Sequence, residues 1–198
     1  MVSFFGLSVK QVEKIEFFTN SIIKHNEHTN LIGKSTITSM WDRHILDCLQ
    51  LTKFINNKKF KILDMGTGAG LPVVLLSILG YQNVTMIESI KKKTDFVNSI
   101  LKELSLSAKI VNKRIERLKI SQQDIIVSRA LAPLTKLLTY ARMHSNKNTT
   151  SLFLKGKNVN KEIDIAMKYY VFDIIKTDSV SSGEGCVLQI KNIKNKNV

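Results

Sequence analysis

The chain of 198 residues suits one compact domain with a short extension, and no stretch approaches the roughly 20 apolar residues that a membrane span requires. Its first residues lack the pattern of a secretory signal, so we expect a cytoplasmic protein. The 30 Lys and Arg residues outnumber the 16 Asp and Glu residues, and the net charge of +14 favours an anionic partner, above all nucleic acid, although lysines that merely face solvent would give the same balance.

Residues 8–55 are predicted to be helical. Ser8 and Gln11 have the spacing of a capping box at the start of the first helix. A second helix is expected from about Thr36 to Phe54, because apolar residues recur there at helical spacing on one side.

Short strands and helices alternate from residue 60 onward. The predicted strands are 60–65, 84–88, 108–111, 124–128, 151–154, 169–175 and 186–193, and the predicted helices are 72–79, 92–104 and 133–143. The polar end from Lys191 to Val198 is expected to be frayed. The alternation predicts an α/β fold with a mostly parallel, doubly wound, Rossmann-like sheet. We divide the chain into an N-terminal helical extension, residues 1–57, and a core, residues 58–198.

The most specific motif is the glycine-rich loop after the first predicted strand. Open α/β sheets bind ligands at this place, and glycines let the backbone approach a ligand closely. The dinucleotide fingerprint G-x-G-x-x-G, counted from Gly66, requires glycine where this chain has Leu71. The glycines here are Gly66, Gly68 and Gly70, with Asp64 two residues ahead of them. This spacing resembles the first motif of Rossmann-like methyltransferases that use S-adenosylmethionine (SAM).

Acidic residues follow the next two strands at the same edge of the sheet. Glu88 ends the second strand, where a carboxylate can accept hydrogen bonds from ribose hydroxyls; the alternative is a solvated charge. Ile115 and Glu116 follow the third strand, where the first could cover an adenine and the second could accept from its amino group. A short helix with an acid in its first turn would explain the same pair.

Several segments from about Asn26 to Gly156 carry a more particular pattern. They are Asn30-Leu31, Arg43-His44-Ile45-Leu46-Asp47, the loop from Asp64 to Pro72, Glu88-Ser89 with Lys91-Lys92, Arg114-Ile115-Glu116, Ser128-Arg129-Ala130 with Pro133, and Leu154-Lys155-Gly156. In this order they resemble the bacterial small-subunit (16S) ribosomal RNA guanine-N7 methyltransferases, the RsmG or GidB family.

The resemblance implies transfer of a methyl group from SAM to N7 of a guanine in 16S rRNA. It implies cofactor contacts at Gly66, Leu71, Ile115, Glu116 and Arg129. With the loop and strand-end residues, the predicted cofactor site comprises Asp64, Gly66, Gly68, Gly70, Leu71, Glu88, Ile115, Glu116 and Arg129. The chain departs from the family pattern at Val73, Cys48 and Ile32, where Gly, Ser and Thr are usual. The larger side chain of Val73 could shift the following helix against the cofactor and so change the affinity for the cofactor.

The expected chemistry is positioning alone, without a general base or a metal. Guanine N7 carries an exposed lone pair, so it can attack the methyl group without first losing a proton. Enzymes that methylate amines usually carry Asp/Asn-Pro-Pro-aromatic after the fourth strand, where this chain has Ser128 to Leu131. Neither Cys48 nor Cys186 is placed as a nucleophile for carbon methylation, and both are predicted to be reduced.

Basic residues near the expected mouth of the site are the predicted RNA contacts. They are Arg43, His44, Lys91, Lys92, Lys93 and Lys155. The alternative is a structural role for His44 and solvated charges for the lysines and Arg43. Arg129 could hold the methionine carboxylate or an RNA phosphate, or form a structural ion pair with Asp64 or Glu116.

Two other functions fit the residues: a SAM-dependent methyltransferase of another substrate, and an RNA-binding Rossmann-like module without catalysis. The expected partner is small-subunit ribosomal RNA or an assembly intermediate of that subunit, bound by a monomer away from membranes.

Overall fold

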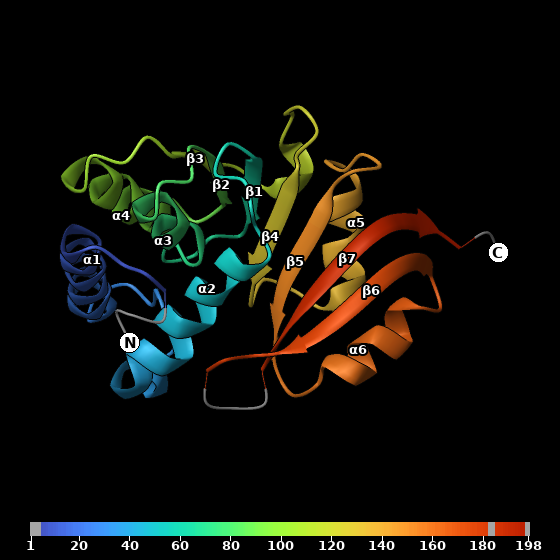
Figure 1. Ribbon diagram of the computed structural model, residues 1–198, viewed down its shortest axis with the longest axis horizontal. Coiled ribbons are helices and arrows are strands. Elements are labelled where there is room, and N and C mark those ends of the chain that lie inside the picture. Colours follow the sequence, from blue (N-terminus) through green and yellow to red (C-terminus); the bar gives the residue numbers. More distant parts are fainter. Residues whose placement is uncertain (1–4, 182–184, 197–198) are drawn as a thin grey trace.

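A computed structural model describes residues 5–181 and 185–196, which form a seven-stranded sheet of order β3-β2-β1-β4-β5-β7-β6 (Figure 1). The strands are β1 Lys61–Met65, β2 Asn83–Glu88, β3 Lys109–Asn112, β4 Ile125–Arg129, β5 Thr150–Lys155, β6 Tyr170–Asp178 and β7 Cys186–Asn195. The pairs among β1 to β5 are parallel, and β7 pairs antiparallel with both β5 and β6. The predicted mostly parallel α/β sheet is confirmed, and its strand order reverses between β1 and β4, where such sheets bind ligands.

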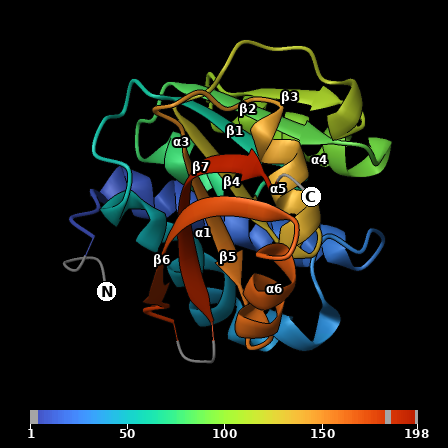
Figure 2. The same ribbon diagram turned by 90° about the vertical axis from the view of Figure 1, so that its right-hand side faces the viewer.

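Helices cover both faces of the sheet (Figures 1 and 2). One face carries α1 (Val9–Asn26), α3 (Val73–Ile78) and α4 (Lys91–Glu103), and the other carries α5 (Leu134–Arg142), α6 (Val159–Ala166) and the 3₁₀ turn η4 (Ile115–Arg117). Successive strand residues point to opposite faces, so Ile62 packs in the first apolar cluster and Leu63 in the second.

The predicted second helix is an irregular helical run, labelled α2 in Figure 1. Its pieces are the 3₁₀ helix η1 Lys34–Ser39, the π-helix η2 Trp41–Leu46, the short α-helix α2 Asp47–Leu49 and the 3₁₀ helix η3 Gln50–Lys53. Of the apolar residues at helical spacing, Met40, Ile45, Cys48 and Leu49 are buried, whereas Trp41 is 37 % exposed. A π segment inside a helix often accompanies a functional site, and this one carries Arg43 and His44.

The first helix begins as its sequence predicts, with Ser8 as N-cap and a complete capping box to Gln11. Its inner residues Ile15, Phe18 and Ile22 pack in the same cluster as α3 and the sheet. The division of the chain at residue 57 stays a prediction.

The C-terminal region differs from its prediction in two elements. Helix α6 was not predicted, and β7 continues to Asn195, so the expected fraying is wrong for residues 191–195. Those residues are ordered because they pair with β6; Asn197 and Val198 lie outside the described residues. No helix in the described part of the chain is both long and apolar enough to cross a membrane.

Candidate active site

The glycine-rich loop leaves β1 and turns back against β2. The backbone N–H groups of Gly66 and Thr67 both donate to the carbonyl of Ile87, at 3.0 and 3.1 Å. Gly66 and Gly68 have φ of 70° and 58°, the left-handed region that favours glycine. A Cβ atom on Gly66 would lie 2.4 Å from Leu131 Cδ1, whereas one on Gly68 would meet no described atom within 4 Å. The loop therefore presents open space at Gly68.

Gly70 and the residues after it face the core instead. A Cβ atom on Gly70 would lie 2.6 Å from Val74 Cγ2, and the side chains of Leu71 and Val73 are buried in the cluster around α1 and α3. At Gly70 and Leu71, therefore, only the backbone is available to a ligand. The Val73 side chain is accommodated within the core.

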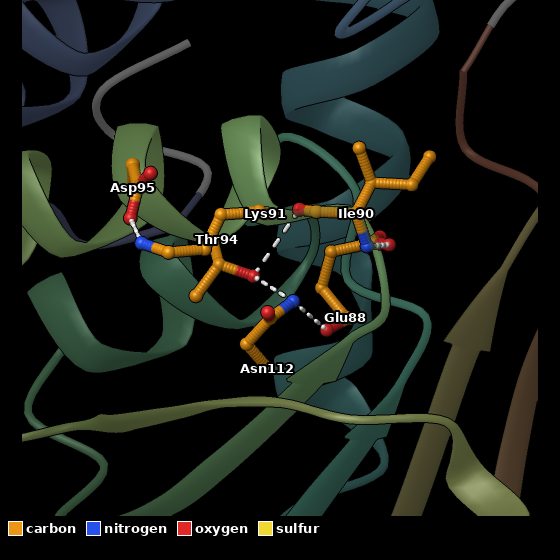
Figure 3. A network of polar contacts seen from close by, with 6 residues as sticks. All are labelled: Glu88, Ile90, Lys91, Thr94, Asp95 and Asn112. Carbon is orange, nitrogen blue, oxygen red and sulfur yellow. Dashed lines mark hydrogen bonds and ion pairs between the residues drawn. The ribbon is translucent and has the colours of Figure 1, made fainter.

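Glu88 lies at the end of β2, and Figure 3 shows its hydrogen bonds with Ile90 and Asn112. Its Oε2 accepts the N–H of Gly68 at 3.1 Å and its Oε1 accepts the N–H of Ile90 at 2.8 Å. Its carbonyl accepts from the amide of Asn112 at 2.9 Å, and the same amide donates to Thr94. The carboxylate is thus fixed in orientation, and each of its oxygens retains further accepting capacity.

A cavity of about 190 Å³ opens next to Glu88. Its lining is Gly66, Ile87, Glu88, Ser89, Lys113, Arg114, Ile115, Glu116, Leu131, Ala132, Lys136 and Tyr140. Ile115 is buried against it, and Glu116 Oε1 accepts the hydroxyl of Tyr140 at 2.6 Å, which lowers the pKa of Glu116. The predicted site residues Gly66, Glu88, Ile115 and Glu116 therefore come together. Lys113, Lys136 and Tyr140 were missed, because nothing in their spacing marks them.

Asp64 is fully buried at the end of β1, and neither carboxylate oxygen has a hydrogen bond within the described residues. Burial raises the pKa of Asp64 to about 8; the nearby Thr67 hydroxyl and Arg129 guanidinium oppose this rise, and Glu88 adds to it. The Asp64 side chain therefore largely holds its proton near pH 7, and a cationic group beside it would favour the ionised form.

Arg129 ends β4 and contacts the π-helix. Its Nη1 donates to His44 Nδ1 at 2.8 Å and to the carbonyl of Arg43 at 3.4 Å, and the other ring nitrogen of His44 lies 2.7 Å from the hydroxyl of Thr36. Arginine has no acceptor, so His44 Nδ1 is the unprotonated nitrogen. Burial, followed by the charges of Arg129 and Arg43, lowers the pKa of His44 to about 4.

This geometry favours positioning roles for both residues. His44 is neutral at physiological pH and both of its nitrogens are occupied. Among the described residues Arg129 forms no ion pair with Asp64 or Glu116. The structure therefore lacks the ion pair that was the alternative to a ligand contact for Arg129.

A larger cavity of about 540 Å³ lies on the other side of Arg129. It is lined by Thr36, Arg43, His44, Asp47, Arg129, Ala130, Leu154, Lys155, Gly156, Lys157, Glu162, Ser181 and Gly185. A neighbouring hollow that includes Asn30 and Leu31 shares His44, Arg129 and Ala130 with it. The predicted RNA contacts Arg43, His44 and Lys155 therefore meet in one place, although they come from distant segments.

The loop from β4 to α5 separates the two cavities. Arg129 and Ala130 line the larger one, whereas Leu131 and Ala132 line the smaller one. Ala130 has φ of 55°, which non-glycine residues rarely adopt and which turns the chain sharply between the cavities.

An ion pair holds this loop in place. Lys155 Nζ lies 2.6 Å from Glu162 Oε2 and donates to the carbonyl of Ala132 at 3.1 Å, while Glu162 Oε2 also accepts the N–H of Leu134 at 2.7 Å. The side chain of Lys155 is only 10 % exposed. A phosphate contact at Lys155 remains a prediction, and it would require this pair to open.

The remaining predicted residues, Lys91, Lys92 and Lys93, form the first turn of α4. They follow Glu88 closely in the chain, but they do not line the larger cavity. Lys91 pairs with Asp95 one turn further along the helix (Figure 3). No cluster of metal-ligating side chains occurs in the part of the chain that the structure describes, and burial raises the pKa of Cys48 to about 12.

Comparison with known families gives one clear match. The family model described as GidB, rRNA small subunit methyltransferase G, matches residues 11–190. A protein of Rickettsia prowazekii named ribosomal RNA small subunit methyltransferase G is 38 % identical over 182 residues, covering 92 % of this chain and 94 % of that protein. A protein of the same name from Paramagnetospirillum magneticum is 30 % identical over 188 residues, covering 95 % of this chain and 92 % of the relative.

Solved structures with low sequence identity share the fold. A mutant of MtNAS in complex with S-adenosylmethionine has a TM-score of 0.64 at 10 % identity, covering 92 % of this chain and 76 % of that one. A methyltransferase from Pyrococcus furiosus has a TM-score of 0.55 at 18 % identity, covering 75 % of this chain and 81 % of that one.

Proposed function

The chain belongs to the rRNA small subunit methyltransferase G family of SAM-dependent enzymes, and we propose that it transfers the methyl group of SAM to N7 of a guanine in 16S rRNA. The observation that carries this proposal is the shared wall. The loop that carries Arg129, Ala130, Leu131 and Ala132 borders both cavities, so a cofactor in the smaller cavity and a base in the larger one would approach each other at the edge of this loop.

The smaller cavity and the glycine loop fit SAM. The open space at Gly68 admits a ligand against the backbone, and Glu88 beside it offers carboxylate oxygens to ribose hydroxyls. Ile115 supplies an apolar surface and Glu116 an acceptor for the adenine. Asp64, which largely holds its proton at pH 7 because burial raises its pKa to about 8, would lose that proton and receive the ammonium of the methionine part.

SAM supplies an electrophilic methyl group on a sulfonium centre. The protein has to orient the base and exclude water, because guanine N7 presents its lone pair without deprotonation. His44 is unsuited to proton transfer, since its pKa is about 4 and both nitrogens are engaged. Cys48 is unsuited to nucleophilic attack, since burial raises its pKa to about 12.

The larger cavity fits an RNA base with its phosphates. Its volume of about 540 Å³ exceeds that of the smaller cavity, and Arg43 and Arg129 provide cationic groups at its wall. Asp47 is held there by hydrogen bonds from Ser179 and Gln50, both 2.8 Å from Oδ1. We place the target guanine in this cavity, and the names of the relatives support ribosomal RNA as the substrate. We further propose that the enzyme acts as a monomer, on RNA that is free or in an assembling subunit.

Nucleoside analysis of small-subunit rRNA tests the proposal. In cells that lack the protein, 7-methylguanosine at one position should disappear, and the wild-type gene should restore it. A Gly68→Val gene, which blocks the open space, should not restore it although the protein accumulates. Unchanged 7-methylguanosine together with loss of another methylated nucleoside would replace the assigned chemistry but keep the enzyme class.

A further inference from the structure

A third cavity lies away from the active site and is markedly basic. It has a volume of about 340 Å³ and is lined by Arg142, Ser145, Asn146, Lys147, Thr149, Lys191, Asn192, Ile193 and Lys194. Three chain segments build it: the end of α5, the connection from α5 to β5, and the end of β7. Figure 2 shows the end of β7 beside α5, and these two elements are in contact.

The charge of this cavity is of one sign. Four of the lining residues are cations and none is an acid. Within the described residues none of the four forms an ion pair. Two acids lie close by in the fold, but neither lines the cavity: Asp173, the cross-strand partner of Lys191, accepts from the Asn192 amide at 2.5 Å, and Asp124 accepts the N–H of Lys61 at 2.8 Å.

A strand irregularity brings two of the cations to one side. In a regular strand, residues three apart point to opposite faces, so Lys191 and Lys194 would diverge. Here the register between β6 and β7 shifts after Val171, where Lys194 pairs with Val171 and Lys191 with Asp173. Asn192 adopts φ of 54° at the shift. The bulge therefore turns both lysines into the same cavity, as bulges commonly re-aim side chains.

The cavity lies at the end of the sheet where β5 begins, whereas the active site lies at the end where β5 finishes. Thr149 lines it just before β5 begins, whereas Lys155 lines the larger active-site cavity where β5 ends. The six residues of β5 span roughly 17 Å along the strand. A single nucleotide held in the active site would not reach the basic cavity.

We propose that this cavity binds phosphate groups of the RNA substrate, as a second contact remote from the methylated base. The proposal rests on the proposed function for the identity of the substrate. Four cations, with a neutral donor in the side-chain amide of Asn146, match a phosphodiester backbone, which proteins contact to fix position and orientation. Such a contact would favour large, folded RNA over small fragments.

The test compares two four-residue variants of the full chain. The first carries Arg142→Gln, Lys147→Gln, Lys191→Gln and Lys194→Gln. The control removes the same charge elsewhere, with Lys10→Gln, Lys24→Gln, Lys102→Gln and Lys109→Gln, whose side chains are exposed outside all three cavities. Binding of 16S rRNA is measured against salt concentration, and SAM binding and thermal unfolding are measured beside it.

The first variant should bind 16S rRNA at least about 10-fold more weakly at 0.1 M salt, with its log–log salt slope smaller by about 0.7 to 0.9 per lost contact. The control should retain most of its affinity, and SAM affinity should stay within about twofold in both variants, because distant sites act independently. Equal losses in the two variants, or no loss in the first, would overturn the proposal.

A further measurement with inorganic phosphate distinguishes a cavity that binds RNA from one that binds a free anion. If millimolar inorganic phosphate stabilises the wild type but not the first variant, while both bind RNA equally, the cavity is a phosphate site unrelated to RNA and the proposal fails. RNA binding is measured here without methylation. Failure of the N7 assignment would therefore appear only in the nucleoside analysis, and failure of the basic cavity only in these binding curves.

Discussion

Gly68 and Gly70 are two residues apart and both have positive φ, but their surroundings differ. Gly68→Val should lower the free energy of unfolding by about 1–2 kcal/mol, because a residue with a Cβ atom is strained at φ of 58°, and should weaken SAM binding about 100-fold or more by filling the open space. Gly70→Ala should lower the free energy of unfolding further, by about 2–4 kcal/mol, because its Cβ meets Val74. Calorimetry with SAM and urea unfolding of both variants check this. Equal loss of stability in the two would contradict it.

The buried carboxylate of Asp64 makes stability depend on pH. Its pKa in the folded protein is about 8, well above the ordinary 3.8, so the folded state holds a proton that the unfolded state releases between these values. Its contribution is therefore most favourable below about pH 4 and is lost as pH rises through about 8. Asp64→Asn, which cannot ionise, should have a higher Tm than the wild type at pH 8, and the difference should vanish towards pH 4. Thermal unfolding without ligand measures it.

The same carboxylate should respond to the cofactor. If Asp64 receives the ammonium of SAM, binding at pH 7 releases a proton from the wild type and none from Asp64→Asn. Calorimetry in buffers of different ionisation enthalpy counts the protons. Equal release from both proteins would remove Asp64 from the cofactor site.

At this scale the sequence predicts the residues that belong to a motif, and it misses those that depend on tertiary partners. Gly66, Glu88 and Ile115 were predicted from spacing and resemblance, and the structure brings them to one cavity. Tyr140 reaches the same cavity from α5. The sequence of this helix does not show which of its faces lies at the cavity, so no local pattern distinguishes Tyr140. Lys155 reads as a free cation in the sequence, and only the fold brings Glu162 to it.

Among the elements, the loop from β4 to α5 depends most on contacts outside itself. Glu162→Ala should remove the partner of Lys155 and of the Leu134 N–H and so loosen the wall over Gly66. SAM binding should weaken about 5- to 30-fold, a cost of about 1–2 kcal/mol. Glu162→Gln should restore part of this, because its amide oxygen can still accept. Asp164→Ala, on the exposed side of the same helix, is the matched control. If the Glu162 and Asp164 variants bind SAM alike, the ion pair has no positioning role.

Helices and strands whose apolar residues repeat at a clear spacing were predicted within a few residues. Elements without such a clear repeat were missed or given the wrong geometry. The helix Val159–Ala166 mixes polar and apolar residues over only eight positions, too few to establish a periodicity. The end of β7 is rich in lysine and asparagine, and strand pairing there overrides composition. The run from residue 34 to 53 has helical spacing, but spacing alone does not separate α from 3₁₀ or π geometry.

For the whole molecule, the proposed chemistry predicts a flat pH profile. At saturating SAM and RNA, kcat should vary little between about pH 6 and 8, because N7 needs no base and the pKa of His44 is about 4. His44→Gln should lower activity through the position of Arg129 without reshaping the profile. A wild-type slope of one log unit per pH unit that disappears in His44→Gln would assign His44 a proton-transfer role.

The convergence of distant segments is what the sequence could not specify. Arg43, Arg129 and Lys155 line one cavity because the π-helix, β4 and β5 meet at one sheet edge. The family resemblance named these residues together, but their mutual contacts follow from the strand order. The basic cavity at the opposite edge had no sequence signal, since lysines occur throughout the chain.

The place of β7 has a consequence for biosynthesis. It follows β6 in the chain but lies between β5 and β6, so a nascent polypeptide that has emerged through residue 178 has no strand for β6 to join and leaves an edge of β5 uncovered. Uncovered strand edges recruit other chains. A ribosome that stalls, or a reading frame that stops, before Cys186 would therefore yield an aggregation-prone product that chaperones must shield. This holds even though strands β1 to β5, which carry the glycine-rich loop, have already been made.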